Sequence, residues 1–146
     1  MFERLKRLRF FVGRLLSAQD FQEEQDYLLH RLRRHNRIMH GSGVVTGLQV
    51  SLSGTNLNVR PGIALDCEGH EIIVDAEQTI ATPSDEGSPQ FLVIHYQENN
   101  VDPISPLSDN DMPQASHIEE GFLLAYESND AFGHVLSNYS NEPRAS

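Results

Sequence analysis

The sequence contains no tryptophan and a single cysteine, Cys67. One cysteine cannot form a disulfide within the chain, and reduced thiols are typical of the cytosol. No apolar stretch approaches the roughly 20 residues that span a bilayer. The apolar stretch at residues 10–13 is too short for the core of a secretory signal. We therefore expect a cytoplasmic protein without a structural disulfide.

The motifs that commonly mark enzymes are also missing: the chain has no P-loop, GxGxxG, HExxH or GxSxG sequence. Cys67 precedes His70 by three residues, but a metal needs three or four ligands and a nucleophile needs a shaped pocket, so we interpret this segment as a structural turn. His30, His35 and His40 are five residues apart, and steps of about 140° on a straight α-helix keep them from converging. The sequence predicts no catalytic residue, no metal site and no cofactor.

Basic residues are scarce after residue 40. Residues 1–40 carry nine bases and five acids, whereas residues 41–146 carry two bases and sixteen acids. These opposite net charges favour docking between copies or onto oppositely charged neighbours, although a solvated helix beside an acidic domain has the same composition. The acidic remainder of the chain and the lack of aromatic residues between the helix arginines argue against a nucleic-acid partner.

Residues 1–16 form a basic arm with apolar residues every three or four positions. A segment this short is marginal as a free helix and needs a surface on which to order. That surface is a partner protein, the chain's own domain or an anionic bilayer. The residues that would contact a membrane or partner are Phe2, Arg4, Leu5, Arg7, Leu8 and Phe11.

Residues 17–41 are predicted to form one long helix. Ser17 begins a capping-box-like sequence, acidic residues fill the first turns, and arginines fill the last turns before Gly41. Two heptad positions form a mainly apolar seam with polar interruptions. This seam either contacts another chain or packs on the β domain of its own chain. Its residues are Phe21, Leu28 and His35 at one position, and Gln25, Leu32 and Met39 at the other.

After the helix, the apolar period changes to two, which predicts a β domain over residues 42–136. Strands are expected at residues 44–52, 57–59, 63–65, 72–74, 78–82, 91–96 and 122–126. Residues 99–117, rich in Pro, Asp, Ser and Asn, are predicted to form a long exposed loop, and residues 137–146 a loose tail. The predicted fold is α+β, with an N-terminal long helix joined to a small, mostly antiparallel β domain.

Several short sequences form a pattern that extends from the helix into the first strands. Its helical part is GRLLSAQDF at 13–21, EQDY at 24–27 and RRHNR at 33–37. Its turn and strand part is HGSGVV at 40–45, GLQV at 47–50, VRPGIALD at 59–66 and GHEI at 69–72. This pattern resembles baseplate-associated proteins of phage-tail-like contractile injection systems, extracellular or cell-bound.

The resemblance implies a structural component that joins, plugs or extends such a particle by protein–protein contacts. It also implies that the chain acts within an assembled particle, which is membrane-associated or released by lysis. Its partners would be other baseplate, spike, tube or sheath proteins, further copies of itself, or a membrane surface, and not nucleic acid. Two alternatives stay open: a membrane-anchoring adaptor that uses the basic arm, and a tail-fibre or receptor-binding adaptor.

Two groups of residues are the predicted sites. Glycines let the backbone adopt unusual torsions where the helix gives way to strand. The structural joint comprises Gly41, Gly43, Gly47, Pro61, Gly62, Asp66 and Gly69. The interface candidates are Phe21, Glu24, Gln25, Tyr27, Arg33, Arg34, Asn36, Arg37 and His40. Among these, Glu24, Arg34 and Arg37 are expected to hold the helix to the β domain or to a neighbour, and Asn36 and His40 to bond the helix's last carbonyls.

Overall fold

The computed structural model describes residues 4–83, 90–107 and 112–128. An N-terminal helix is followed by antiparallel strands, so the predicted α+β class is confirmed. In chain order the elements are α1 (Ala18–His35), the π-helical turn η1 (Asn36–His40), β1 (Gly43–Gly47), β2 (Val50–Ser53), β3 (Asn56–Val59), β4 (Gly62–Leu65), β5 (Glu71–Val74), β6 (Gln78–Ala81), β7 (Gln90–Ile104) and β8 (Gln114–Ser128).

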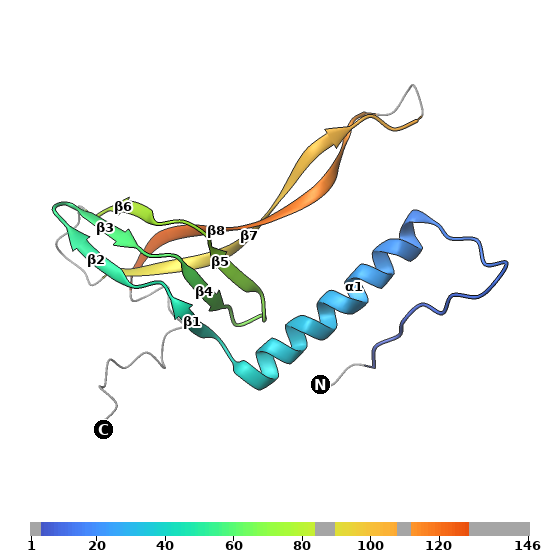
Figure 1. The fold of residues 1–146 in the computed structure, drawn as a ribbon, viewed down its shortest axis with the longest axis horizontal. Coiled ribbons are helices and arrows are strands. Elements are labelled where there is room, and N and C mark those ends of the chain that lie inside the picture. Colours follow the sequence, from blue (N-terminus) through green and yellow to red (C-terminus); the bar gives the residue numbers. More distant parts are fainter. Residues whose placement is uncertain (1–3, 84–89, 108–111, 129–146) are drawn as a thin grey trace.

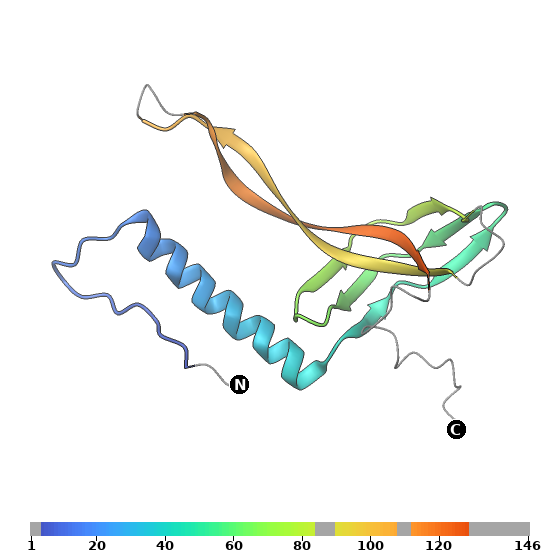
Figure 2. The ribbon, with the colours of Figure 1, turned by 180° about the vertical axis from the view of Figure 1, so that it is seen from behind.

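The strands form two small sheets and one long ribbon. The sheets have the orders β1-β4-β5 and β2-β3-β6, and β7 pairs with β8 along nearly its full length. All of these pairings are antiparallel. Figure 1 shows α1 and the β7–β8 ribbon extending away from the sheets toward the same side, and Figure 2 shows the same arrangement from behind. The strands predicted at residues 91–96 and 122–126 lie within β7 and β8 and pair with each other.

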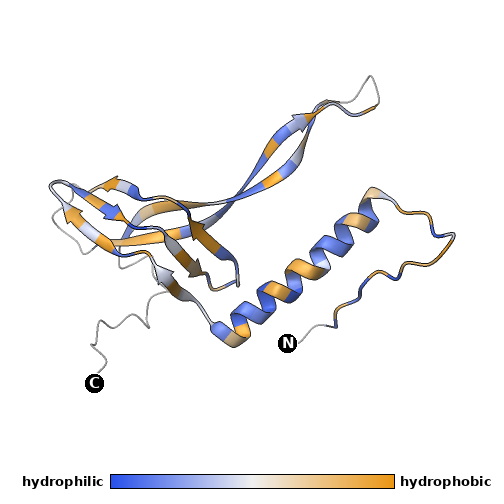
Figure 3. Ribbon diagram, in the orientation of Figure 1, coloured by the Kyte–Doolittle hydropathy of each residue, from blue (hydrophilic) through white to orange (hydrophobic). Residues whose placement is uncertain are grey.

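The core is small and lies entirely in the strands. Among the described residues, the buried hydrophobic side chains are Val59 on β3, Ala64 on β4, and Ile72 and Val74 on β5. Neither α1 nor η1 contains a buried residue. Hydrophobic and hydrophilic residues alternate along α1 in Figure 3, yet no strand within the described residues covers the length of the helix. Over most of its length the seam is therefore exposed, and it meets the chain's own β domain near the C-terminal end of α1, at Leu32.

Helix α1 begins and ends with the local signals that the sequence carries. Ser17 and Asp20 form a reciprocal capping box, in which the Asp20 amide donates to Ser17 Oγ and the Ser17 amide donates to Asp20 Oδ2. The helix then widens into η1, where the Gly41 amide donates to the Asn36 carbonyl five residues earlier, over 3.0 Å. Gly41 adopts a φ of 71°, which ends the helix.

The π-helical turn brings two of the three histidines together. On a straight α-helix His30, His35 and His40 cannot converge, but at this turn the ring centroids of His35 and His40 are 5.2 Å apart. In a π-helix the hydrogen bonds run between residues five apart, so side chains at this spacing come onto one side. The rings meet edge to face, at an interplanar angle of 72°.

The prediction of a single strand over residues 44–52 is wrong. β1 and β2 belong to different sheets, because Gly47 and Leu48 adopt φ values of 68° and 58° and turn the chain between them. Gly47 lies opposite Gly62 in the β1–β4 register. A Cβ atom on either glycine would collide with the backbone of the facing strand, so the pair allows the strands to approach closely here.

The prediction of an exposed loop over residues 99–117 is also wrong for most of its length. β7 continues to Ile104 and β8 begins at Gln114, while residues 108–111 lie outside the described residues. In a two-stranded ribbon every strand is an edge and no side chain must enter a core, so polar residues are tolerated. Pro103 fits for the same reason, because an edge strand can lose one donor.

The basic arm forms no regular element over its described residues, 4–16. Phe2 and the predicted tail 137–146 lie outside the described residues. Phe11 and Leu15 are exposed, as expected for a short segment that has no surface beneath it. No helix in the described part of the chain is long and apolar enough to cross a bilayer.

Candidate protein–protein interface

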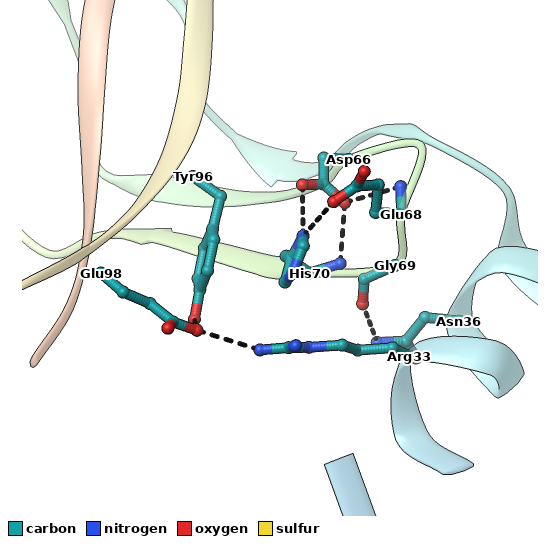
Figure 4. A network of polar contacts seen from close by, with 8 residues as sticks. All are labelled: Arg33, Asn36, Asp66, Glu68, Gly69, His70, Tyr96 and Glu98. Atoms are coloured by element: carbon teal, nitrogen blue, oxygen red, sulfur yellow. Dashed lines mark hydrogen bonds and ion pairs between the residues drawn. The ribbon is translucent and has the colours of Figure 1, made fainter. Parts of the chain in front are cut away.

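Helix α1 is attached to the β structure near its C-terminal end. The Arg33 guanidinium lies 3.1 Å from Glu98 Oε1 on β7, and the Asn36 side-chain amide donates to the Gly69 carbonyl over 3.1 Å. Figure 4 shows these contacts meeting beside the β4–β5 turn. The helix, the turn and the ribbon are therefore connected at one place, which we call the junction: Arg33, Asn36, Gly69, His70, Tyr96 and Glu98.

Gly69 brings the turn against the helix backbone. It adopts a φ of +92°, and a Cβ atom on this residue would collide with the Arg33 carbonyl oxygen. Both the torsion and the available space therefore require glycine at this position. Because Gly69 and Arg33 are far apart in sequence, this fit depends on how the turn and the helix meet.

Tyr96 lies at the centre of the junction. Its ring stacks on His70 with centroids 4.2 Å apart, and its hydroxyl donates to Glu98 Oε1, the same oxygen that Arg33 contacts. Burial, together with hydrogen bonds to Glu98 and Glu120, raises the pKa of the Tyr96 hydroxyl. The tyrosine therefore stays protonated and remains a donor to Glu98 at any physiological pH.

The β4–β5 turn is held by Asp66. Its carboxylate accepts hydrogen bonds from the amides of Glu68 and His70, and it lies 2.6 Å from His70 Nδ1. Ligand atoms of Asp66, Glu68 and His70 lie within 4.8 Å of one another. These contacts use the Asp66 oxygens to shape the turn and to orient the His70 ring against Tyr96. The cluster of Asp66, Glu68 and His70 therefore serves to hold the turn in shape.

A face of α1 lies free on the side of the predicted seam. Phe21, Leu28 and Leu32 are 59%, 57% and 52% exposed, and Gln25 lies among them and is also exposed. Residues three and four apart share one side of a helix, so these side chains form a continuous stripe. We call this set the α1 stripe: Phe21, Gln25, Leu28 and Leu32. An apolar stripe of this length in water normally contacts another surface.

A groove lies where η1 meets the first sheet. It encloses about 500 Å³ and is open to solvent. Leu32 from α1 lines it together with residues of β1, β4 and β5, among them Val44, Val45, Ile63 and Leu65. Val44 and Val45 lie on β1, an edge strand. The groove therefore continues the apolar surface from the α1 stripe onto a sheet edge.

The predicted interface residues divide into two groups. Arg33 and Asn36 contact the chain's own β structure. The Asn36 side chain donates to the Gly69 carbonyl, while its backbone amide donates to the carbonyls of Arg33 and Leu32. The remaining candidates stay at the surface of α1 and η1, exposed or half-buried: Phe21, Glu24, Gln25, Tyr27, Arg34, Arg37 and His40. Glu24, Arg34 and Arg37 were expected to hold the helix to the β domain, but none of the three has an ion pair within the described residues. Arg33 makes that contact instead.

The predicted joint residues lie at three places. Gly41 and Gly43 connect η1 to β1, and Gly47, Pro61 and Gly62 surround the close approach of β1 and β4. Asp66 and Gly69 form the turn that contacts α1.

Sequence reasoning missed the part that Tyr96, Glu98 and His70 play in the junction. Tyr96 and Glu98 are two residues apart, so they share one face of β7, which is a signal available from the sequence. Nothing local indicates that this face meets Arg33, 65 residues earlier. Comparison of the chain with models of protein families and with curated proteins found no match.

Proposed function

We propose that this chain is a structural component of a phage-tail-like contractile particle, held to its neighbours by protein–protein contacts. The observation that carries the proposal is the uncovered α1 stripe, since α1 is amphipathic and has no buried residue. A helix of 18 residues is marginal alone and gains most of its stability from packing on its apolar face. The partner surface would supply that packing.

The small core supports the same proposal. The described residues bury four hydrophobic side chains, whereas large apolar side chains are exposed on the arm, α1, both sheets and the ribbon. Parts that complete their burial on assembly have this distribution, as obligate interfaces resemble a domain core that has been divided. The resemblance of residues 13–75 to baseplate-associated proteins indicates the kind of assembly.

Particle incorporation tests this function. The tagged chain is expressed in the cells that make it, particles are isolated by sedimentation, and their proteins are identified by mass spectrometry. We expect the chain to sediment with tube, sheath and spike proteins. Leu28→Asp on the stripe should reduce its recovery in particles by about tenfold or more, because a charge is placed in a buried apolar contact.

The matched control is His30→Asp, which introduces the same side chain on the opposite side of the same helix. Two residues on an α-helix are separated by about 200°, so this control places the same carboxylate on the helix and leaves the stripe intact. It should be recovered like the unmodified chain. Recovery of the chain as free protein, separate from any tube or sheath protein, would show that the proposed function is wrong.

A further inference from the structure

The charges along α1 are separated into two halves. Residues 18–26 contain four acids and no base, and residues 27–35 contain three arginines and no acid. The acids are Asp20, Glu23, Glu24 and Asp26, and the arginines are Arg31, Arg33 and Arg34. This order suits the helix dipole, but it also makes the helix complementary to a reversed copy of itself.

We propose that the α1 helices of two copies pair antiparallel, with the α1 stripe as their shared contact. This inference rests on the proposed function in one respect: both require the stripe to be covered by protein. It adds that the partner is a second copy. A two-fold axis at the middle of α1 relates the two copies, so each copy contributes the same surface to the contact. Two-fold symmetry is the commonest symmetry of soluble oligomers.

The register follows from the stripe and from the helix ends. With the axis between residues 26 and 27, Ala18 of one copy lies opposite His35 of the other, so the two α-helices overlap completely. Leu32 then meets Phe21 of the second copy, and Leu28 meets its Gln25. Each large apolar side chain is placed against the partner's stripe, and η1 lies beyond the overlap at each end.

The same register pairs the charges beside the stripe. Glu24 and Arg31 are seven residues apart, so they lie on the same flank of the helix. Across the two-fold axis, Glu24 of one copy faces Arg31 of the other, and this pair occurs twice. Neither residue has an ion pair within the described part of the chain.

A parallel pair of α1 helices lacks this pairing of opposite charges. In a parallel pair the acidic half would lie against the acidic half and the basic against the basic, which is unfavourable. Asp20 and Arg33 are already paired, with Arg14 and Glu98. The charges that remain on the two halves still have opposite signs, so the antiparallel pair keeps its complementarity.

A charge-exchange series tests the pairing on the purified full-length chain. Its mass is measured by sedimentation equilibrium over a range of concentrations, with reductant present because Cys67 is exposed. We expect a monomer–dimer equilibrium. Glu24→Arg and Arg31→Glu should each weaken the dimer by about tenfold or more, since each change places like charges together twice. The double variant Glu24→Arg/Arg31→Glu should restore the dimer to within a few-fold of the unmodified chain.

The rescue is specific to the antiparallel register, because residues seven apart on one helix do not contact each other and face different residues in a parallel pair. Circular dichroism of each variant checks that α1 still forms. A chain that is monomeric at every concentration, or a double variant as weak as the single variants, would overturn the pairing. A dimer in a chain that is absent from particles would leave the pairing standing and reject the proposed function.

Discussion

At the scale of single residues, Gly69 determines how closely the β4–β5 turn approaches the helix. A side chain here would meet two costs: the positive φ and the collision with the Arg33 carbonyl. The left-handed torsion alone costs about 1–2 kcal/mol for a residue with a Cβ atom. The collision adds to this and acts on a contact that holds α1 in place.

We therefore expect Gly69→Ala to separate the turn from the helix. The matched control is Gly54→Ala, because Gly54 also has a positive φ but a Cβ atom there meets nothing within 4 Å. Both variants should lose stability to urea, but loss of the Asn36 side-chain amide signal from its hydrogen-bonded position in NMR spectra should occur in Gly69→Ala alone. An unchanged Asn36 signal in Gly69→Ala would show that the helix tolerates the added methyl group.

Tyr96 shows how one residue joins three elements. It contacts His70 beside the turn, donates to Glu98 on its own strand, and lies beneath Arg33, whose guanidinium carbon is 6.0 Å from the ring centroid. Stacking and cation–π contacts each contribute modestly. Their combination at one ring explains why the helix has a defined attachment without a buried core beneath it.

At the scale of elements, the first turn of α1 depends on the ionised form of Asp20. Hydrogen bonds from the Ser17 backbone and side chain, followed by the Arg14 guanidinium 2.6 Å away, lower the pKa of the Asp20 carboxyl. Because the folded pKa lies below the unfolded value, this stabilisation is complete above about pH 4 and is lost as the pH falls through the folded pKa.

Acidification should therefore loosen the N-terminal end of α1 before it affects the rest of the helix. Amide hydrogen exchange measured from pH 5 down to pH 2, and corrected for the intrinsic pH dependence, should show falling protection at residues 20–22. Asp20→Asn should show low protection there at every pH, because the amide cannot pair with Arg14 as a carboxylate does. Equal protection of these amides in both proteins at pH 5 would contradict this role of Asp20.

The β7–β8 ribbon shows how an element can be stable without an amphipathic sequence. Its outer half consists of residues such as Asn99, Asn100 and His117, which pair across the two strands. Backbone hydrogen bonds and cross-strand side-chain contacts supply the order, because none of the described residues forms a second layer over this part. Ser116, which donates to the Asp102 carbonyl over 2.6 Å, is one such cross-strand contact.

At the scale of the whole molecule, two long arms extend from a small centre, and the Arg33–Glu98 ion pair joins them. Arg33 and Glu98 are 27% and 42% exposed, so their ion pair contributes only about 0–1 kcal/mol to stability. The position of this ion pair matters more than its strength, because it lies near the base of α1. A small change of angle there moves the far end of the helix by a large distance.

We predict that Arg33→Gln leaves the urea midpoint nearly unchanged but broadens the distance between the arms. Spin labels at Gln22→Cys on α1 and Asn99→Cys on β7, in a Cys67→Ser background, would report this distance by pulsed electron resonance, with labelled chains diluted into unlabelled ones. The control is Arg37→Gln, since Arg37 has no ion pair among the described residues and should leave the distribution narrow. Equal distributions in both variants would mean that Arg33 does not set the angle.

The sequence by itself determined the features that depend on neighbouring residues. The Ser17 cap, the helix that follows, its end at Gly41 and the α+β order all follow from local hydrogen-bonding and torsional preferences. Only the tertiary structure decided which residues distant in sequence contact one another. It brought Arg33 to Glu98 and Gly69 to the helix backbone, and it paired residues 99–104 as strand. These outcomes depend on where the elements meet. A polar segment forms a strand where a partner strand lies beside it and a loop where none does.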